Sequence, residues 1–178
     1  MSPDPLLDRA TILDAFTRLG TRLARRGLVA DVYVFGGAAM ALAYDARRAT
    51  RDIDAVFTAH GAVVEEARAV ATELGLPQWW LNEQAAAYVA PTGDPNAARV
   101  FDHPGLRVSA ASPRHLLAMK ILAARRRDAE DIAVLTRHLA VTTSAEALAI
   151  TAAVFPDEIV PDRARLILED LLDGNGTT

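Results

Sequence analysis

The spacing of apolar residues along the chain predicts helices at both ends and short strands between them. Apolar residues that recur every three or four positions are typical of amphipathic helices, and runs of β-branched and aromatic residues are typical of strands. The expected helices cover residues 5–26, 37–45, 59–74, 82–87, 112–125, 128–139, 143–155 and a last stretch from 161. The expected strands cover residues 31–35, 52–57, 99–101 and 106–110, the last two joined as a hairpin.

This order of elements indicates an α+β fold, in which a small mixed β-sheet is flanked by helices and followed by a helical C-terminal part. We expect the sheet within residues 1–110 and the helical part within residues 111–178, packed together as one compact unit. Two helix starts are marked by their side chains. Ser112 precedes Pro113, and Thr143 with Glu146 resembles a capping box.

The composition excludes several classes of protein. The chain has 178 residues, a formal net charge of -4 and no cysteine, so we expect neither disulfides nor thiolate metal sites. No apolar stretch reaches the roughly 18 residues of a membrane span, and no signal peptide is evident, which predicts a soluble cytoplasmic protein. The negative charge gives no overall attraction to nucleic acid, so any such contact requires a local basic patch.

Residues 32–57 carry the pattern with the clearest chemistry. A buried strand leads into Gly36 and Gly37, and the next strand begins with Asp52 and Asp54. Side chains alternate along a strand, so the two aspartates are expected on one face while Ile53 points into the core. Paired carboxylates repel each other unless a cation lies between them, and Mg²⁺ (or Mn²⁺) binds carboxylates together with phosphate oxygens. Because the glycines leave room for a phosphate, the pattern predicts metal-dependent phosphoryl or nucleotidyl transfer.

A plainer interpretation of the same residues is a tight strand-to-helix turn followed by two solvent-facing aspartates on an edge strand. If the site binds metal, Asp102 after residues 99–101 is the candidate for a third carboxylate, although a loop aspartate fits there equally well. The number of metal ions therefore stays open. The four histidines show no ligand spacing, and of Trp79 and Trp80 at least one is expected in the core.

Arginines flank the predicted site in the sequence. Arg47, Arg48 and Arg51 precede the aspartates, and residues 125–127 are a second run of three. Together they would form a positive rim suited to a triphosphate or to a polyanion such as a tRNA end. The alternative for each run is a solvated charged surface. Lys120, the single lysine among 19 basic residues, lies on an otherwise apolar helix, either with its head in solvent or near phosphate or carboxylate groups.

The order of hydrophobic strand, Gly-Gly and Asp-hydrophobic-Asp resembles the nucleotidyltransferase superfamily of the DNA polymerase β type. Further motifs are similar to the AbiEii-type family, which includes the nucleotidyltransferase toxins of type IV toxin–antitoxin and abortive-infection systems. These motifs are Arg48-x-Thr50-x-Asp52-Ile53-Asp54, Trp80-Leu81-Asn82, Ser112-Pro113 with residues 116–120, and Arg127-Asp128-x-x-Asp131-Ile132. The resemblance spans roughly residues 30 to 140.

The resemblance implies a nucleotidyltransferase core in which Asp52 and Asp54 hold the metal. It also implies that Lys120 and Asp131 belong to the active site, and that the nucleotide is bound by Gly36, Gly37, Arg48, Thr50 and Lys120. For Asp131 the alternative is a carboxylate that satisfies free amides at a helix N-terminus. Asp128 is expected to be only a helix cap.

The expected function is Mg²⁺-dependent transfer of a nucleoside monophosphate from a nucleoside triphosphate (NTP) to an acceptor, with release of pyrophosphate. From the resemblance, the acceptor would be RNA, in particular a tRNA 3′ end, and a cognate antitoxin would be a partner protein. Two alternatives are a nucleotidyltransferase that acts on a small molecule such as an antibiotic, and a non-catalytic protein-binding module that retains the fold.

Overall fold

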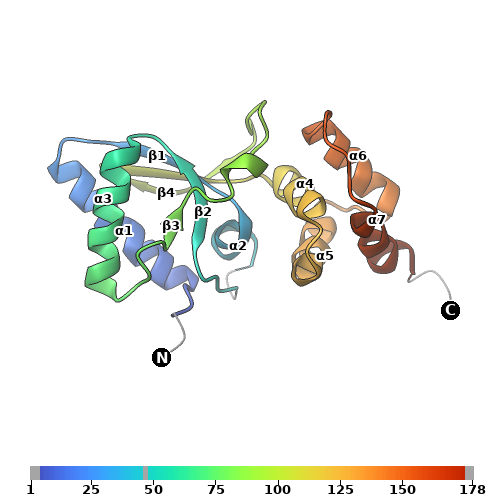
Figure 1. The fold of residues 1–178 in the computed structure, drawn as a ribbon, viewed down its shortest axis with the longest axis horizontal. Helices are drawn as coiled ribbons and strands as arrows, with labels where there is room; N and C mark the ends of the chain where they lie inside the picture. Colours follow the sequence, from blue (N-terminus) through green and yellow to red (C-terminus); the bar gives the residue numbers. More distant parts are fainter. Residues whose placement is uncertain (1–4, 46–47, 175–178) are drawn as a thin grey trace. The chain divides into compact units, whose positions relative to one another are not determined.

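A computed structural model of the chain describes residues 5–45 and 48–174 (Figure 1). The chain divides into two compact units. The first comprises residues 1–87 and 97–111, and the second comprises residues 88–96 and 112–178. Each unit is described by itself. None of the helices in the described ranges is both long enough and apolar enough to span a membrane.

The first unit contains a five-stranded mixed sheet, which confirms the predicted α+β class. Its strands are β1 Ala30–Val34, β2 Ile53–Phe57, β3 Leu81–Asn82, β4 Ala98–His103 and β5 Leu106–Ala110. Their order in the sheet is β3-β2-β1-β5-β4. Strand β1 is antiparallel to β2 and parallel to β5, β3 runs parallel to β2, and β4 and β5 form the predicted hairpin.

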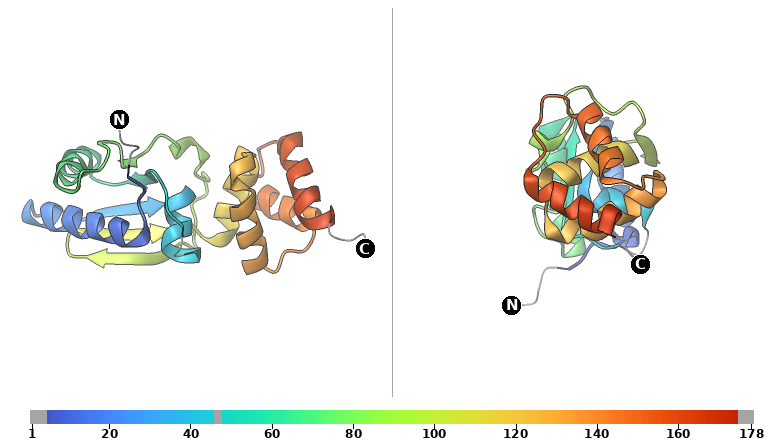
Figure 2. Two further views of the ribbon diagram at one scale, coloured as in Figure 1. Left: turned by 90° about the horizontal axis from the view of Figure 1, so that it is seen from below. Right: turned by 90° about the vertical axis from the view of Figure 1, so that its right-hand side faces the viewer.

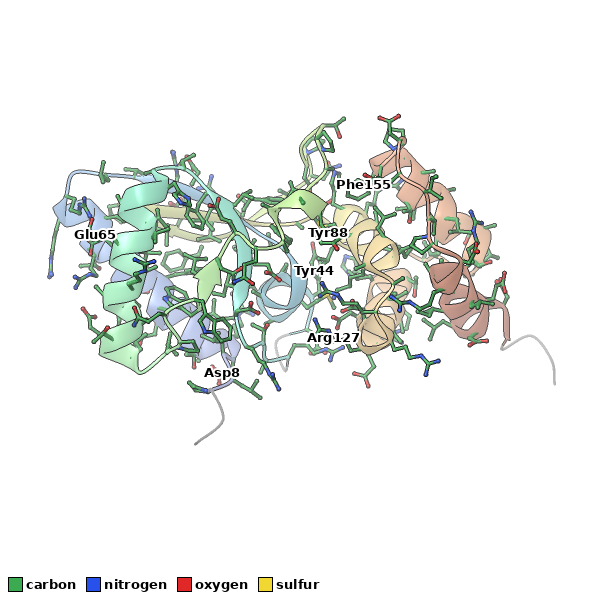
Figure 3. All side chains as sticks on the ribbon, in the orientation of Figure 1. Asp8, Tyr44, Glu65, Tyr88, Arg127 and Phe155 are labelled. Atoms are coloured by element: carbon green, nitrogen blue, oxygen red, sulfur yellow. The ribbon has the colours of Figure 1, made fainter. Side chains whose placement is uncertain are left out.

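Helices α1 (Arg9–Arg25) and α3 (His60–Leu74) pack against each other, as Figures 1 and 2 show, and cover one face of the sheet. The Phe16 ring of α1 lies 5.7 Å from the Phe101 ring, and Phe101 pairs across strands with the fully buried Val108. The covered face is therefore the face of Val108. Asp8, which is labelled in Figure 3, caps the N-terminus of α1, and its carboxylate accepts a hydrogen bond from the Thr11 amide at 2.8 Å.

The opposite face of the sheet has a different character, and we call it the open face. It is formed by the alternate residues of three adjacent strands, which are half-buried or exposed. They are Asp54 and Val56 on β2, Asp31 and Tyr33 on β1, and Arg107 and Ser109 on β5. Since cross-strand partners point to the same side of a sheet, these six side chains share one surface.

Trp80 fastens the segment before β3 to the core. Its side chain is fully buried, and its indole N–H donates to the Ala67 carbonyl at 2.8 Å, whereas Trp79 is 42% exposed. The expectation of one core tryptophan is thus confirmed. The predicted helix over residues 82–87 is wrong, because the Ile53 amide donates to the Trp80 carbonyl (2.6 Å) and draws residues 81–82 into pairing with β2. Only Ala86–Tyr88 form a 3₁₀ turn.

The second unit consists of four α-helices in its described residues: α4 Pro113–Ala123, α5 Ala129–His138, α6 Ser144–Val154 and α7 Asp162–Leu168. Both predicted helix starts are confirmed. Ser112 caps α4 with Pro113 in its first turn, and Thr143 with Glu146 forms a capping box on α6. Short helical turns at Arg126–Asp128 and Glu169–Asp173 complete the described part of this unit.

Residues 88–96, which we expected within the sheet region, cluster with the helical unit. Polar contacts to the start of α4 account for this. The Asp94 carboxylate accepts a hydrogen bond from the Ser112 amide (2.7 Å) and lies 3.2 Å from Nδ1 of His115. His115 Nε2 lies 2.9 Å from the Gly93 carbonyl oxygen. His115 thus contacts the 88–96 segment from α4.

A half-buried carboxylate links α1 to α3 and makes the stability of the first unit depend on pH. Glu66 accepts hydrogen bonds from Arg22 (2.6 Å) and Arg26 (3.0 Å). Burial raises the pKa of Glu66, but the hydrogen bonds and charges of both arginines outweigh this, so the pKa lies below its ordinary value. The ion pairs therefore stabilise the fold above the unfolded pKa of about 4.3, and this contribution is lost as the pH falls through the folded pKa.

We expect Glu66→Gln to lower the free energy of unfolding by about 1 kcal/mol at pH 7 and by progressively less below about pH 4. Urea denaturation at a series of pH values measures this difference. Glu65→Gln is the matched control, because Glu65 also pairs with Arg26 but its side chain is 70% exposed (Figure 3). An equal effect of Glu66→Gln at both ends of the pH range would contradict the assignment.

Candidate functional site

Asp52 and Asp54 lie at the start of β2, and both are half-buried. The intervening Ile53 is fully buried. The alternation expected from the sequence is therefore present for Ile53 and Asp54, with Asp54 on the open face. Asp52 directly precedes the strand.

Gly36 lies directly against Asp54. The Phe35 amide donates to the Asp54 carbonyl (3.1 Å), which brings the end of β1 beside the start of β2. Gly36 has φ = 63°, and a Cβ atom at this position would lie 3.1 Å from Oδ2 of Asp54. A side chain here would be strained by its backbone conformation and would also press on the carboxylate. The absence of a side chain at Gly36 therefore allows the backbone to lie directly against the Asp54 carboxylate.

For the nucleotidyl transfer expected from the sequence, Gly36→Ala should lower the rate, because it displaces the Asp54 carboxylate, and it should cost about 1–2 kcal/mol of stability through backbone strain. Gly75→Ala is a matched control. Gly75 has nearly the same φ (66°), but a Cβ atom added there would meet no other atom within 4 Å. Comparing activity and urea midpoints of the two variants separates strain from contact. Equal activity of both variants would show that the contact with Asp54 is unimportant.

Thr50 holds the loop before β2 in place. Its backbone pairs with Leu7 through two hydrogen bonds of 2.7 and 3.0 Å, and its hydroxyl donates to the Asp52 carbonyl (3.0 Å). A Cβ atom on Gly37 would lie 2.9 Å from the Thr50 hydroxyl oxygen. Thr50 and Gly37 are therefore in close contact, and Thr50 supports Asp52 through the backbone.

The structure describes all arginines of the predicted positive rim except Arg47. Arg48 Nε lies 3.9 Å from Asp45 Oδ2, and the Arg48 amide donates to the Asp45 carbonyl (3.0 Å). Arg51 is exposed, while Arg47 lies outside the described residues. Residues 125–127 are exposed and belong to the second unit.

Asn82 on β3 contacts the aspartate pair, although the sequence pattern predicted no role for it. In the parallel register of β2 and β3, Asn82 is the partner of Asp54. Its side-chain amide donates to Oδ2 of Asp52 at 3.1 Å. The motif Trp80-Leu81-Asn82 was visible in the sequence, but apolar periodicity gave no sign that residues 81–82 pair with β2.

Asp102 does not complete the site. It lies on β4, which is separated from β2 by β1 and β5. Asp102 pairs with Arg107, which pairs with Asp31 at the start of β1, whereas Asp54 lies beyond the other end of β1. The expectation of Asp102 as a third metal ligand was therefore wrong, because the hairpin places it on the far edge of the sheet.

Lys120 and Asp131, which the family resemblance assigns to the active site, lie together in the second unit. The Lys120 ammonium is 2.7 Å from Oδ2 of Asp131 and 3.0 Å from Oδ1 of Asp128, and all three side chains are at most 13% exposed. The lysine head is thus buried and paired rather than solvated. Asp128 makes no side-chain capping bond, so the expectation that it is only a cap was wrong. Its carboxylate binds Lys120 instead.

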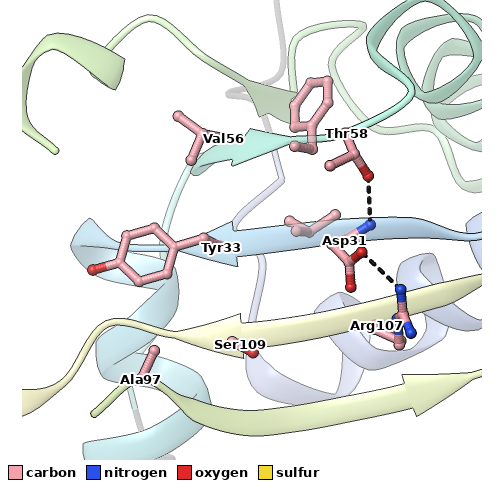
Figure 4. A pocket seen from close by; sticks show the side chains of 9 residues that line it. Asp31, Tyr33, Val56, Thr58, Ala97, Arg107 and Ser109 are labelled. Atoms are coloured by element: carbon pink, nitrogen blue, oxygen red, sulfur yellow. Dashed lines mark hydrogen bonds and ion pairs between the residues drawn. The ribbon is translucent and has the colours of Figure 1, made fainter. Parts of the chain in front are cut away.

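A hollow of about 500 Å³ lies on the open face (Figure 4). Tyr33 and Val56 line the hollow. Val56 follows Asp54 on the same face of β2, so the hollow begins two residues along the strand from Asp54. Asp31 and Arg107 also line it and form an ion pair of 2.8 Å. Its volume lies within the range of small-molecule sites.

The chemistry of Asp52 and Asp54 suits a hard divalent cation, because they offer carboxylate oxygens beside an accessible Gly36. Among residues 5–45 and 48–174, no group of three or more histidine, aspartate or glutamate side chains forms a metal cluster. A pair is sufficient for Mg²⁺, which retains several waters and takes its remaining ligands from substrate phosphates. The residues present therefore fit one such ion.

Comparison with a family of known proteins agrees with this chemistry. The model of a family described as "Nucleotidyltransferase of unknown function (DUF6036)" matches residues 11–153. Among curated proteins, no sequence matches the chain. A solved structure, an antigenic nucleotidyltransferase-like protein from Paracoccidioides brasiliensis, aligns with 17% identity and a TM-score of 0.48, over 95% of this chain and 100% of that one.

Proposed function

The chain belongs to this family of nucleotidyltransferases of unknown function, and we propose that it transfers a nucleoside monophosphate from an NTP to a hydroxyl-bearing acceptor. The observation that supports this most strongly is the pair Asp52 and Asp54 at the start of β2, with the side-chain-free Gly36 against the Asp54 carboxylate. In the reaction, the acceptor oxygen forms a bond to the α-phosphorus and its proton passes to water. The bond from the α-phosphorus to the β-phosphate oxygen breaks, and pyrophosphate leaves.

Asp52 and Asp54 would hold Mg²⁺ or Mn²⁺ through their carboxylate oxygens. When bound, such an ion lowers the pKa of an attacking hydroxyl and neutralises charge on the phosphates. Gly36 places no side chain against the Asp54 carboxylate, Gly37 leaves room for Thr50, and the Thr50 hydroxyl holds the backbone of Asp52. These residues contribute by binding and positioning, which is how most catalysis of phosphoryl transfer arises.

The roles that the resemblance gives to Lys120, Asp131 and Arg48 remain proposals. The contacts of Lys120 with Asp128 and Asp131 support a structural role in the second unit, because each buried charge has an opposite partner. A variant that keeps the fold without these charges, described in the Discussion, separates this role from a catalytic one.

For the acceptor, the AbiEii-type resemblance supports RNA, with a tRNA 3′ end as substrate and a cognate antitoxin as partner. Such a protein would be the toxin of a toxin–antitoxin pair. A local basic patch is required for this, since the chain has a net charge of -4.

The charges of the open face favour a second candidate, a small-molecule acceptor. Arg107 is paired with Asp31 at 2.8 Å, and Arg99, which also lies on this side of the sheet, is 3.7 Å from Asp102. With Asp54 added, these side chains carry one net negative charge. A polyanionic strand gains no attraction there, whereas an uncharged or cationic hydroxyl compound would fit the hollow lined by Tyr33 and Val56.

Incubation with each α-labelled NTP and Mg²⁺ tests the proposal. The chain is supplied separately with total cellular RNA and with a low-molecular-weight cell extract, and mass spectrometry identifies the labelled product. Label in RNA supports the toxin-like function, and label in a small molecule supports the second candidate. The non-catalytic module is the answer if calorimetry detects no metal-dependent NTP binding and Asp52→Ala changes nothing.

A further inference from the structure

We propose that Asn82 is a positioning residue that orients the Asp52 carboxylate for metal binding. This inference rests on the proposed function, because it concerns the metal held by Asp52 and Asp54. It adds to that site a residue that contacts the Asp52 carboxylate.

The pairing of β2 with β3 brings Asn82 to the aspartates. The register joins Ile53 with Leu81 and Asp54 with Asn82, so Asn82 is the neighbour of Asp54 across the sheet, about 4.8 Å away along the hydrogen-bonding direction. Strand β3 is anchored by Trp80, whose fully buried ring and indole hydrogen bond fix the residue before the strand. The position of Asn82 is therefore set by the core.

The hydrogen bonds of Asn82 also determine which way its amide points. The Gln84 backbone amide donates to Oδ1 of Asn82 at 3.0 Å. Nδ2 donates to Oδ2 of Asp52 at 3.1 Å and to the Trp79 carbonyl at 3.3 Å. A reversed amide would place its oxygen against two acceptors and its NH₂ group against a donor. The NH₂ group is thus directed at Asp52.

A neutral donor at this position suits a metal site better than a third charge. It offsets part of the negative charge on the Asp52 carboxylate, and it brings no charge of its own. The hydrogen bond engages Oδ2 of Asp52 and thereby restrains rotation of the carboxylate that would hold the metal. Groups that hold metal ligands in this way are known to change metal affinity by about 10–100-fold when replaced.

The test is a titration of the full chain with Mn²⁺, in which electron paramagnetic resonance measures the concentration of the free ion. Asn82→Ala is expected to raise the Kd for Mn²⁺ by about 10–100-fold while leaving the urea midpoint of the metal-free chain nearly unchanged. Gln84→Ala is the matched control, since it removes a nearby amide side chain but keeps the backbone N–H that binds Asn82, and its Kd should equal that of the wild type.

The possible results separate the inference from the proposed function. Equal Kd values for wild type and Asn82→Ala overturn the role of Asn82 and leave the metal site intact. A wild-type chain that binds no Mn²⁺ overturns the proposed metal site, and the role of Asn82 with it. If Asn82→Ala does not fold, Asn82→Leu is the second variant, because it retains the approximate size of the side chain and removes the NH₂ donor to Asp52 together with the Oδ1 acceptor.

Discussion

Replacing Asp54 by Asn should reduce nucleotidyl transfer by about 10³-fold or more. The substitution keeps the shape of the side chain and removes one of the two charges that would hold the divalent cation, whose electrostatic contribution to catalysis is several kcal/mol. The measurement is the rate at which label from an α-labelled NTP enters the acceptor fraction. Binding of Mn²⁺ should weaken in parallel.

Asp102→Asn is the control for this prediction. It removes the same charge from the same sheet, but from strand β4, on the edge opposite the aspartate pair. Its activity should match the wild type. Comparable losses in both variants would show that the acidity of the sheet as a whole matters, and full activity of Asp54→Asn would end the proposal for the Asp52 and Asp54 site.

Lys120→Met should destabilise the second unit by about 3–5 kcal/mol. Asp128 and Asp131 are at most 13% exposed, and without the ammonium they would be two buried carboxylates with no counter-charge from Lys120. Thermal or urea unfolding measures the loss. Arg127→Met is the control for removing a nearby cation, because Arg127 is exposed, and it should change stability by less than about 0.5 kcal/mol.

The triple variant Lys120→Met, Asp128→Asn, Asp131→Asn should recover most of the lost stability, since no buried charge is then left unpaired. It also separates structure from catalysis. A triple variant that is folded and active would make these three residues structural, whereas one that is folded but inactive would support the roles that the family resemblance implies for Lys120 and Asp131. If Lys120→Met alone were as stable as the wild type, the buried ion pairs would contribute little.

The local sequence pattern was sufficient to predict the central secondary-structure elements of this protein. The strand before Gly36, the strand that begins with Asp52 and Asp54, and the helices that start at Ser112 and Thr143 were all predicted from neighbouring residues. Each depends on interactions within a few positions, namely side-chain alternation in a strand or a cap at a helix N-terminus. The mixed α+β class followed from the order of these elements.

The partners of the site residues depended on the tertiary structure. Asn82 reaches Asp52 only because Trp80 is buried and draws residues 81–82 into the sheet, against a local pattern that favoured a helix. Only the strand order excludes Asp102 as a third metal ligand. The Asp128 side chain pairs with Lys120, although its position in the sequence suited a helix cap. These contacts join residues that are distant in sequence or compete with a local alternative, so burial and strand pairing decide them, while the chemistry of Asp52, Asp54 and Gly36 was already legible in the sequence.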